Sequence, residues 1–230
     1  MCGRKTLTKG KLEIIEELSI QLWDDTCQHQ PNYNVAPTQI MPILVYEDQR
    51  VVRPMQWGLI PNWVKDPQNV SMFINARSET ITAKRSFSDL IDANRCVVIA
   101  DGYYEWQKVN SKKQPYYITT PDRSILPMAG LWNQWTDNQG ITKFTYTVIT
   151  TAASEQLEFI HPRMPALLEK ENLDIWLNCS DNKPITAIRL LKPYEQVLEA
   201  YPVSGWVNNV SNNSPRCIEK VGQLPGSLFI

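Results

Sequence analysis

The chain has 230 residues and a net charge of -1, and 43% of its residues are hydrophobic, so it can bury a core of its own without covalent cross-links. This charge excludes a general attraction to nucleic acid, and any such binding must come from local clusters of Arg and Lys. The 5 cysteines are odd in number and show no C-x-x-C spacing, which argues against a disulfide framework and a zinc site and favours a reducing cytoplasm. No run approaches about 18 apolar residues, and no charged segment leads into an apolar run at the N-terminus, so we expect neither export nor a membrane span.

The first predicted element is a helix in the segment KLEIIEELSIQLW, with Thr8 as its candidate N-cap. Its apolar residues at helical spacing are Leu12, Ile15, Leu18 and Leu22. Short strands follow, rich in β-branched and aromatic residues and bounded by Pro, Asn, Asp or Gly. They are IMPILVYE, VVRPMQW, RCVVIADGYYEW, QPYYITT, ILPMAGLW and KFTYTVITT. Late in the chain, SEQLEFIH, EKENLDIWLN and PITAIRLL are predicted to be short helices, and EQVLEAYPVS a final strand.

These elements predict an α+β fold in which a mixed or antiparallel sheet curls on itself like a barrel and short helices flank it. No internal repeat or long linker divides the sequence, so we expect a single domain over residues 1–230. The tail is rich in Asn, Ser and Pro, and we expect about the last 15 residues to be irregular.

A cysteine at the second position is the first candidate for chemistry. Because methionine aminopeptidase removes Met1 when the next side chain is small, Cys2 would become an N-terminal residue with an amine beside its thiol. Such a 1,2-aminothiol can capture an aldehyde as an imine and close a five-membered ring on it. The alternative is that Cys2 is a small buried hydrophobe.

Three segments carry polar residues where a plain core would not favour them. In FINARSETIT, apolar residues lead directly into Asn75, Arg77 and Glu79, as at a strand that emerges into a site or at an ordinary solvated strand end. Glu105 lies between two aromatic residues on the same strand face as Tyr103, where burial would raise the pKa of its carboxyl group, unless it is a solvated edge residue. The Pro-rich segment LEFIHPRMP holds a histidine that is a candidate acid or base or, equally, a packing residue.

Ten segments together resemble one known family. They are MCGR at the start, YNVAP at 33–37, WGLIPNW at 57–63, INARSET at 74–80, RCVVIADGYYEW at 95–106, KQPYYI at 113–118, MAGLW at 128–132, TVITTAA at 147–153, IHPRMP at 160–165 and YPVSGWVNNV at 201–210. Their order and joint occurrence over the whole length resemble the SOS response-associated peptidase (SRAP) family, also described as abasic site processing proteins. The resemblance implies the barrel-like fold of that family.

The resemblance also implies a chemistry. The mature N-terminal Cys2 would react with the ring-opened aldehyde of an abasic site in single-stranded DNA and form a thiazolidine crosslink. Asn75 would hold the linkage and the sugar hydroxyls, Glu105 would orient or deprotonate the α-amine, and His161 would exchange protons with the sugar oxygens. An amine with a pKa near ~8 and a thiol near ~8.5 are both partly in their reactive forms at neutral pH. No metal and no other cofactor is needed.

By the same resemblance, a set of residues would bind the DNA strand. Arg77, Arg85 and Arg163 would contact phosphates, and Gly3 and Arg4 adjoin the nucleophile. These four arginines would form a local basic patch on a protein of near-zero net charge.

Pro37 and Trp63 could form an apolar wedge against the bases, although core packing is an alternative for Trp63. The sequence departs from the family pattern at Lys5, where an aromatic residue is frequent, at Val64, where a second Trp can follow, and at Pro162, where Asp is common. The loop KDPQNVSMF is also long. These departures concern base stacking and strand separation and do not touch the nucleophile.

Two other functions remain open at this point. The protein could be a thiol autopeptidase that removes its own Met1, with Cys2, His161 and Asn75 as its reactive set, or a noncatalytic module that binds single-stranded DNA. In each case we expect a monomer in the cytoplasm, associated with the nucleoid when it is bound to DNA.

Overall fold

The computed structural model describes residues 2–66, 72–110 and 112–222, and within these ranges most of the regular structure is sheet. Five strands close into a barrel: β11 pairs with β10, β10 with β7, β7 with β4, β4 with β5, and β5 pairs back with β11. Their bounds are β4 (Ile40–Tyr46), β5 (Arg50–Trp57), β7 (Arg95–Val98), β10 (Met128–Thr136) and β11 (Thr142–Ala152). The predicted curled sheet is therefore confirmed.

Three short strands extend the barrel. β2 (Leu22–Trp23) pairs with β5, whereas β6 (Asn75–Arg77) and β12 (Arg163–Pro165) both pair with β11. β6 and β12 both pair with β11, and the Arg163 guanidinium group binds the Glu79 carboxylate, so the INARSET and IHPRMP segments meet in space although they are far apart in the sequence.

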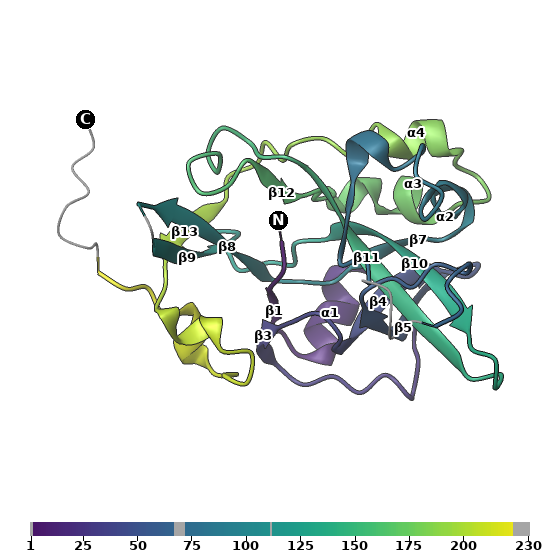
Figure 1. Ribbon diagram of the computed structural model, residues 1–230, viewed down its shortest axis with the longest axis horizontal. Coiled ribbons are helices and arrows are strands. Elements are labelled where there is room, and N and C mark those ends of the chain that lie inside the picture. The colour runs from purple at the N-terminus through teal and green to yellow at the C-terminus, as the bar shows by residue number, and fades with distance from the viewer. Residues whose placement is uncertain (1, 67–71, 111, 223–230) are drawn as a thin grey trace.

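A second sheet lies against the barrel. Its strand order is β13 (Glu199–Pro202), β9 (Lys112–Thr119), β8 (Gly102–Val109), β1 (Lys5–Leu7) and β3 (Asn32–Val35). Figure 1 shows this sheet on the left of the molecule and the barrel on the right, with the N-terminal strand at the boundary between them. The first residues of the chain are thus built into the fold between two sheets.

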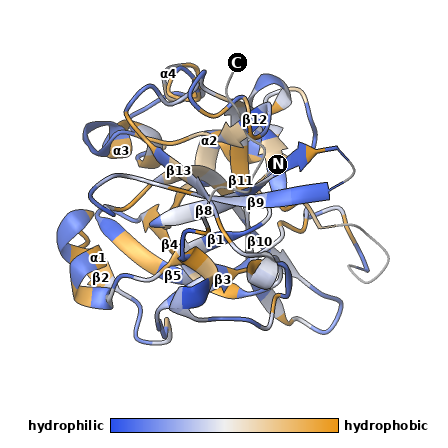
Figure 2. Ribbon diagram, turned by 90° about the vertical axis from the view of Figure 1, so that its left-hand side faces the viewer, coloured by the Kyte–Doolittle hydropathy of each residue, from blue (hydrophilic) through white to orange (hydrophobic). Residues whose placement is uncertain are grey.

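Short helices cover the outside: α1 (Lys11–Glu17), α2 (Ser88–Ala93), α3 (Leu173–Leu177) and α4 (Pro184–Ile188). Arg95 joins α2 and α3 to the barrel, because this buried side chain donates to the carbonyl oxygens of Ile91 at 2.8 Å and of Trp176. Figure 2 shows orange segments on β4 and β5 of the barrel, as expected for strands that contribute to a core, and the outer part of β9 in blue. In the described part of the chain, no helix is long and apolar enough to cross a membrane.

The prediction for the first helix was wrong in its bounds. Gly10, and not Thr8, is the N-cap, and the Glu13 carboxylate accepts a 2.7 Å hydrogen bond from the Gly10 amide. Thr8 instead donates its hydroxyl to Asp101 at 2.7 Å. The helix ends at Glu17, and it exposes 80% of Leu12 because its buried face is formed by Ile14 and Leu18.

The predicted helix in SEQLEFIH is also wrong, since residues 155–160 form consecutive turns. The amide of Ala153 donates to the carbonyl oxygen of Pro162 at 3.0 Å, which closes the segment into a loop between β11 and β12. The segment RCVVIADGYYEW, predicted as one strand, forms two strands, β7 and β8, which belong to different sheets. The remaining predicted strands and late helices are present with shifted ends. Residues 67–71 of the long loop and residues 223–230 of the predicted irregular tail lie outside the described residues.

Candidate active site

The pairing of β1 with β8 places Cys2 beside Glu105. Lys5 lies opposite Tyr103 in this antiparallel pair, and the Tyr104 amide donates to the Arg4 carbonyl at 3.0 Å. Gly102 begins β8 where only glycine fits, because a Cβ atom there would lie 2.2 Å from the Tyr117 hydroxyl oxygen. The N-terminal segment is therefore fixed in register along the strand that carries the carboxylate.

Asn75 reaches the same segment from the barrel. Its Nδ2 donates to the Cys2 carbonyl oxygen at 2.8 Å, so the two sheets are joined at the candidate nucleophile. Its Oδ1 is buried and accepts no hydrogen bond from the described residues. A buried acceptor without a donor is unfavourable by about 1–3 kcal/mol, and a hydroxyl group of a ligand would satisfy it.

Glu105 and His161 face each other across the junction of the sheets. Glu105 is buried, and burial raises the pKa of its carboxyl group, while the nearby charge of His161 acts in the opposite direction. The Arg163 amide donates to His161 Nδ1 at 3.0 Å. The Arg163 carbonyl oxygen lies 3.2 Å from the same nitrogen, so the backbone of Arg163 fixes the orientation of the imidazole ring. The structure brings the four predicted catalytic residues together, with one carboxylate and one imidazole available for proton transfer.

The thiol of Cys2 differs from the sequence-based expectation. Cys2 is fully buried, and burial together with the charge of Glu105 raises its pKa to about 12, whereas a partly ionised thiol was expected. Cys2 is therefore protonated at neutral pH, and its proton must be removed as the sulfur attacks. A neighbouring carboxylate is a group suited to that task.

Lys5 is buried directly beside this site. Its ammonium group donates to the Ile99 carbonyl oxygen at 3.1 Å, and burial lowers its pKa to about 8. Its neighbour Tyr103 is also fully buried, and the Tyr103 hydroxyl has no hydrogen-bond partner among the described residues. The position where the resemblance to the family led us to expect an aromatic residue thus holds a buried charge in this chain.

Replacing Lys5 with Met is expected to stabilise the protein at pH 7. Lowering the pKa of Lys5 from 10.5 to about 8 corresponds to a loss of roughly 3 kcal/mol of folding stability while the side chain is charged. The variant avoids this loss but gives up the hydrogen bond to Ile99, which contributes about 1 kcal/mol. Between these pH values the unfolded chain keeps a proton that the folded chain has lost, so Lys5 makes stability rise with pH in this window.

Urea unfolding of both proteins at pH 7 and near pH 10 measures this effect. The advantage of Lys5→Met should be about 2 kcal/mol at pH 7 and should shrink as the pH rises. The difference between the proteins is the quantity to follow, because buried tyrosines and thiols titrate in the same range. An advantage that stays constant with pH, or a less stable variant, would refute a buried charged Lys5.

The predicted phosphate-binding arginines fall into two groups. Arg77 and Arg85 are exposed, and Arg163 is half-buried, with both oxygens of the Glu79 carboxylate bound to its guanidinium group. Arg4, in contrast, is 9% exposed and donates to Asn34 at 2.6 Å and to the Val207 carbonyl at 2.8 Å. Arg4 is therefore an internal structural residue and does not contribute to an exposed basic patch with the other arginines.

Trp63 exposes 46% of its surface, so the alternative that it packs in the core is wrong. The core position belongs to its neighbour Val64, which packs with Ile60 and Trp135. Pro37 and Gly3 are half-buried. The departure at Val64 thus fills the core and leaves the first tryptophan available at the surface.

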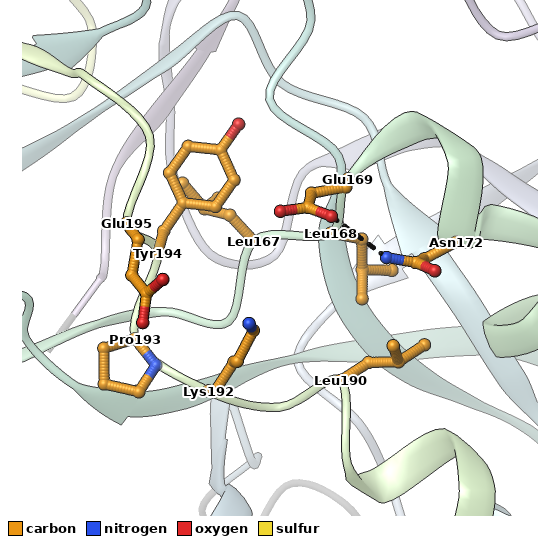
Figure 3. Close-up of a pocket in the computed structure, with 9 residues that line it drawn as sticks. All are labelled: Leu167, Leu168, Glu169, Asn172, Leu190, Lys192, Pro193, Tyr194 and Glu195. Atoms are coloured by element: carbon orange, nitrogen blue, oxygen red, sulfur yellow. Dashed lines mark hydrogen bonds between the residues drawn. The ribbon is translucent and has the colours of Figure 1, made fainter.

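The pocket drawn in Figure 3 lies apart from the predicted site residues. Figure 3 shows a small pocket of about 30 Å³ that is lined by residues between positions 167 and 195, in the part of the chain that follows β12. This volume has room for a water molecule. Its lining residues, among them Glu169, Lys192 and Tyr194, include none of the predicted site residues. In the described ranges, no group of three or more His, Cys, Asp or Glu side chains could hold a metal ion.

A buried thiol that meets an amide, a carboxylate and an imidazole, at the junction of a closed barrel and a second sheet, is an arrangement suited to cysteine chemistry. A sequence model of the family described as "SOS response associated peptidase (SRAP)" matches residues 1–210. The chain belongs to this family.

Relatives and a solved structure agree with this assignment. "Abasic site processing protein YoqW" from Bacillus subtilis is 40% identical over 222 residues, covering 95% of this chain and 99% of the relative. "Abasic site processing protein HMCES" from Xenopus tropicalis is 37% identical, covering 96% of this chain and 78% of the relative. A crystal structure of a protein from Bacteroides thetaiotaomicron has a TM-score of 0.85 and 29% identity, covering 96% of this chain and all of that one.

Proposed function

We propose that this protein processes abasic sites in DNA by capturing them covalently at Cys2. The observation that carries the proposal is the position of Cys2. Asn75 Nδ2 donates to the Cys2 carbonyl oxygen at 2.8 Å, and Cys2 lies beside Glu105 and His161 at the junction of the sheets. The names of the relatives YoqW and HMCES support abasic sites as the substrate.

The chemistry begins once Met1 has been removed. The α-amine of Cys2 condenses with the aldehyde of the ring-opened abasic site, and the imine forms with loss of one water molecule. The thiol sulfur then adds to the imine carbon, while the thiol proton moves to the nitrogen. The product is a thiazolidine that links Cys2 to the DNA, and its formation needs no oxidant or reductant.

The surrounding residues take the roles that their positions allow. Glu105 accepts the proton of the amine or thiol and returns it to nitrogen, because its raised pKa favours proton exchange near neutral pH. His161 exchanges protons with the sugar oxygens, and the unpaired Oδ1 of Asn75 accepts a hydrogen bond from a sugar hydroxyl. These roles rest on the geometry of the site and on the resemblance to the family.

Single-stranded DNA is the form of the substrate that we propose. Arg77, Arg85 and Arg163 would neutralise phosphates, while Trp63 and Pro37 would contact bases next to the backbone of Gly3. We also propose a monomer that acts in the cytoplasm at the nucleoid.

The test of the proposed function is the intact mass of the protein after incubation with an abasic oligonucleotide. We expect a covalent adduct with the mass of protein plus DNA minus one water molecule, and none with an oligonucleotide that has all of its bases. Absence of an adduct with protein shown to lack Met1 would refute covalent capture. Binding of both oligonucleotides without an adduct would indicate the noncatalytic DNA-binding module.

Removal of Met1 by the protein itself is a second candidate activity. The buried Cys2 lies beside a carboxylate and an imidazole, which is the set of groups that a thiol autopeptidase requires. Synthesis in a cell-free system without methionine aminopeptidase tests it. Loss of Met1 from the wild-type chain but not from a Cys2→Ala chain would support self-processing, and retention in both would refute it.

The proposed preference for single-stranded DNA predicts how noncovalent DNA binding depends on salt concentration. With Arg77, Arg85 and Arg163 as the phosphate-binding residues, the logarithm of the noncovalent binding constant should fall with the logarithm of salt concentration with a slope of about -2. Crosslinking within a continuous duplex should be much slower than in a single strand. Fluorescence anisotropy over a salt series measures the slope, and a slope near zero or equal crosslinking of duplex DNA would contradict the prediction.

A further inference from the structure

An exposed aromatic pair adjoins the candidate active site. Phe159 lies in the loop between β11 and β12 and is 55% exposed. Its ring meets the ring of Tyr116 edge to face, with the centroids 5.8 Å apart. The side chain of Gln107 donates to the Phe159 carbonyl oxygen at 3.0 Å, which fixes the loop on the β8–β9 hairpin.

This pair lies next to the reacting groups. Tyr116 is directly opposite Glu105 in the pairing of β8 with β9, and directly opposed residues present their side chains on the same face of a sheet. Phe159 precedes His161 by two residues in the same loop. Farther out on that face of the hairpin, Val109 and Lys112 form an exposed opposed pair.

The loop does not need Phe159 as an anchor. Leu157 and Ile160, in the same set of turns, are 3% and 5% exposed and pack in the main core. Phe159 therefore presents a ring to solvent beside the site, although an apolar side chain of this size would gain from full burial. A ring that is held in place and left accessible is a surface for stacking.

The charges around the ring favour a base over a phosphate group as its ligand. Glu155 and Glu158 are exposed in the same set of turns and would repel a phosphate. Every nucleobase has a flat face that can stack on an aromatic ring without a charge.

We propose that Phe159, supported by Tyr116, is a stacking platform for a nucleobase next to the abasic site in single-stranded DNA. This inference rests on the proposed function and adds a base-binding residue to it. The platform orders the strand beside the lesion, so that the aldehyde is presented to Cys2.

The first experiment measures noncovalent binding to single-stranded DNA that contains a tetrahydrofuran analogue of the abasic site, which has no aldehyde. Phe159→Ala should raise Kd by about 5- to 10-fold, and Phe159→Trp should restore binding whereas Phe159→Leu should not. Because stacking involves no net charge, the salt slope of Phe159→Ala should match that of the wild type. Phe144→Ala is the matched control, because Phe144 is 42% exposed and packs on Trp132 near the outer end of the β10–β11 hairpin, at the lower right of Figure 1.

The second experiment locates the base by removing one flanking base at a time from the same oligonucleotide. At one flanking position, removal of the base should weaken binding to the wild-type protein as much as the Phe159→Ala substitution weakens binding to the intact oligonucleotide. Removal of the same base should not weaken binding to Phe159→Ala any further. Lack of such coupling at every position, or full binding by Phe159→Leu, would overturn the platform.

A separate arm with the aldehyde-bearing oligonucleotide keeps the two proposals apart. Phe159→Ala should still form the crosslink at saturating DNA. If the wild type forms none, the proposed function fails, while the coupling measured with the analogue still decides whether the platform exists.

Discussion

A form of the protein that retains Met1 is expected to give no stable crosslink with abasic single-stranded DNA, while its fold and its noncovalent DNA binding stay nearly intact. The nitrogen of Cys2 is then an amide, which cannot condense with an aldehyde to an imine. The thiol alone forms only a labile hemithioacetal. It is also fully buried, and its pKa is raised to about 12, so it is a poor nucleophile without the neighbouring amine.

Cys2→Ser provides a graded comparison. Its amine can still form an imine, but the hydroxyl group closes the ring poorly, so borohydride should trap a linkage that otherwise dissociates. The mature protein, the Met1-retaining form and Cys2→Ser are incubated with abasic DNA and resolved by denaturing gel and mass spectrometry. A Met1-retaining form that stays uncleaved and still crosslinks as stably as the mature protein would exclude the aminothiol mechanism and direct the search to an internal Lys or Cys.

Four of the five strands of the barrel could be predicted from sequence because each has enough residues to show its composition. β4, β5, β10 and β11 have 7 to 11 residues and end at turn-forming residues. β1, β6 and β12 have 3 residues each, which is too few for any periodicity. These three carry or adjoin Cys2, Asn75 and His161, so their assembly depends on long-range pairing that sequence patterns do not record.

The identities in the site could be predicted, and their surroundings only in part. The aromatic neighbours of Glu105 indicated the raised pKa of its carboxyl group, whereas the burial that raises the pKa of the Cys2 thiol follows only from packing of the two sheets. Arg4 shows the same limit, because its adjacency to Cys2 in sequence suggested that it belongs to a basic patch, whereas its hydrogen bonds to Asn34 and Val207 are internal. Phe159 gave no signal, since a helix was expected there and the register of Tyr116 opposite Glu105 was unknown.

Glu105→Gln is expected to slow crosslink formation by about 100-fold, the lower end of the usual contribution of an acid or base. Burial raises the pKa of Glu105, so the wild-type rate should fall with decreasing pH through a limb that lies above the ordinary range of a Glu carboxyl, about pH 4.3. That limb should vanish in the variant because the amide does not titrate. Glu158→Gln is the control, as Glu158 is exposed in the loop before His161.

The direction of the change also separates two roles for this carboxylate. The charge of Glu105 raises the pKa of the Cys2 thiol, so Glu105→Gln should lower that pKa and increase the thiolate fraction at a given pH. If the carboxylate acted only through this charge, its removal would speed capture. If it transfers the proton, capture slows even though the thiol has become more acidic. Single-turnover crosslinking over pH 4 to 9 measures the rate of capture. The thiolate fraction of Cys2 follows from the thiolate absorbance of Glu105→Gln after subtraction of the absorbance of Glu105→Gln with Cys2→Ser. A faster rate in Glu105→Gln would rule out Glu105 as the base.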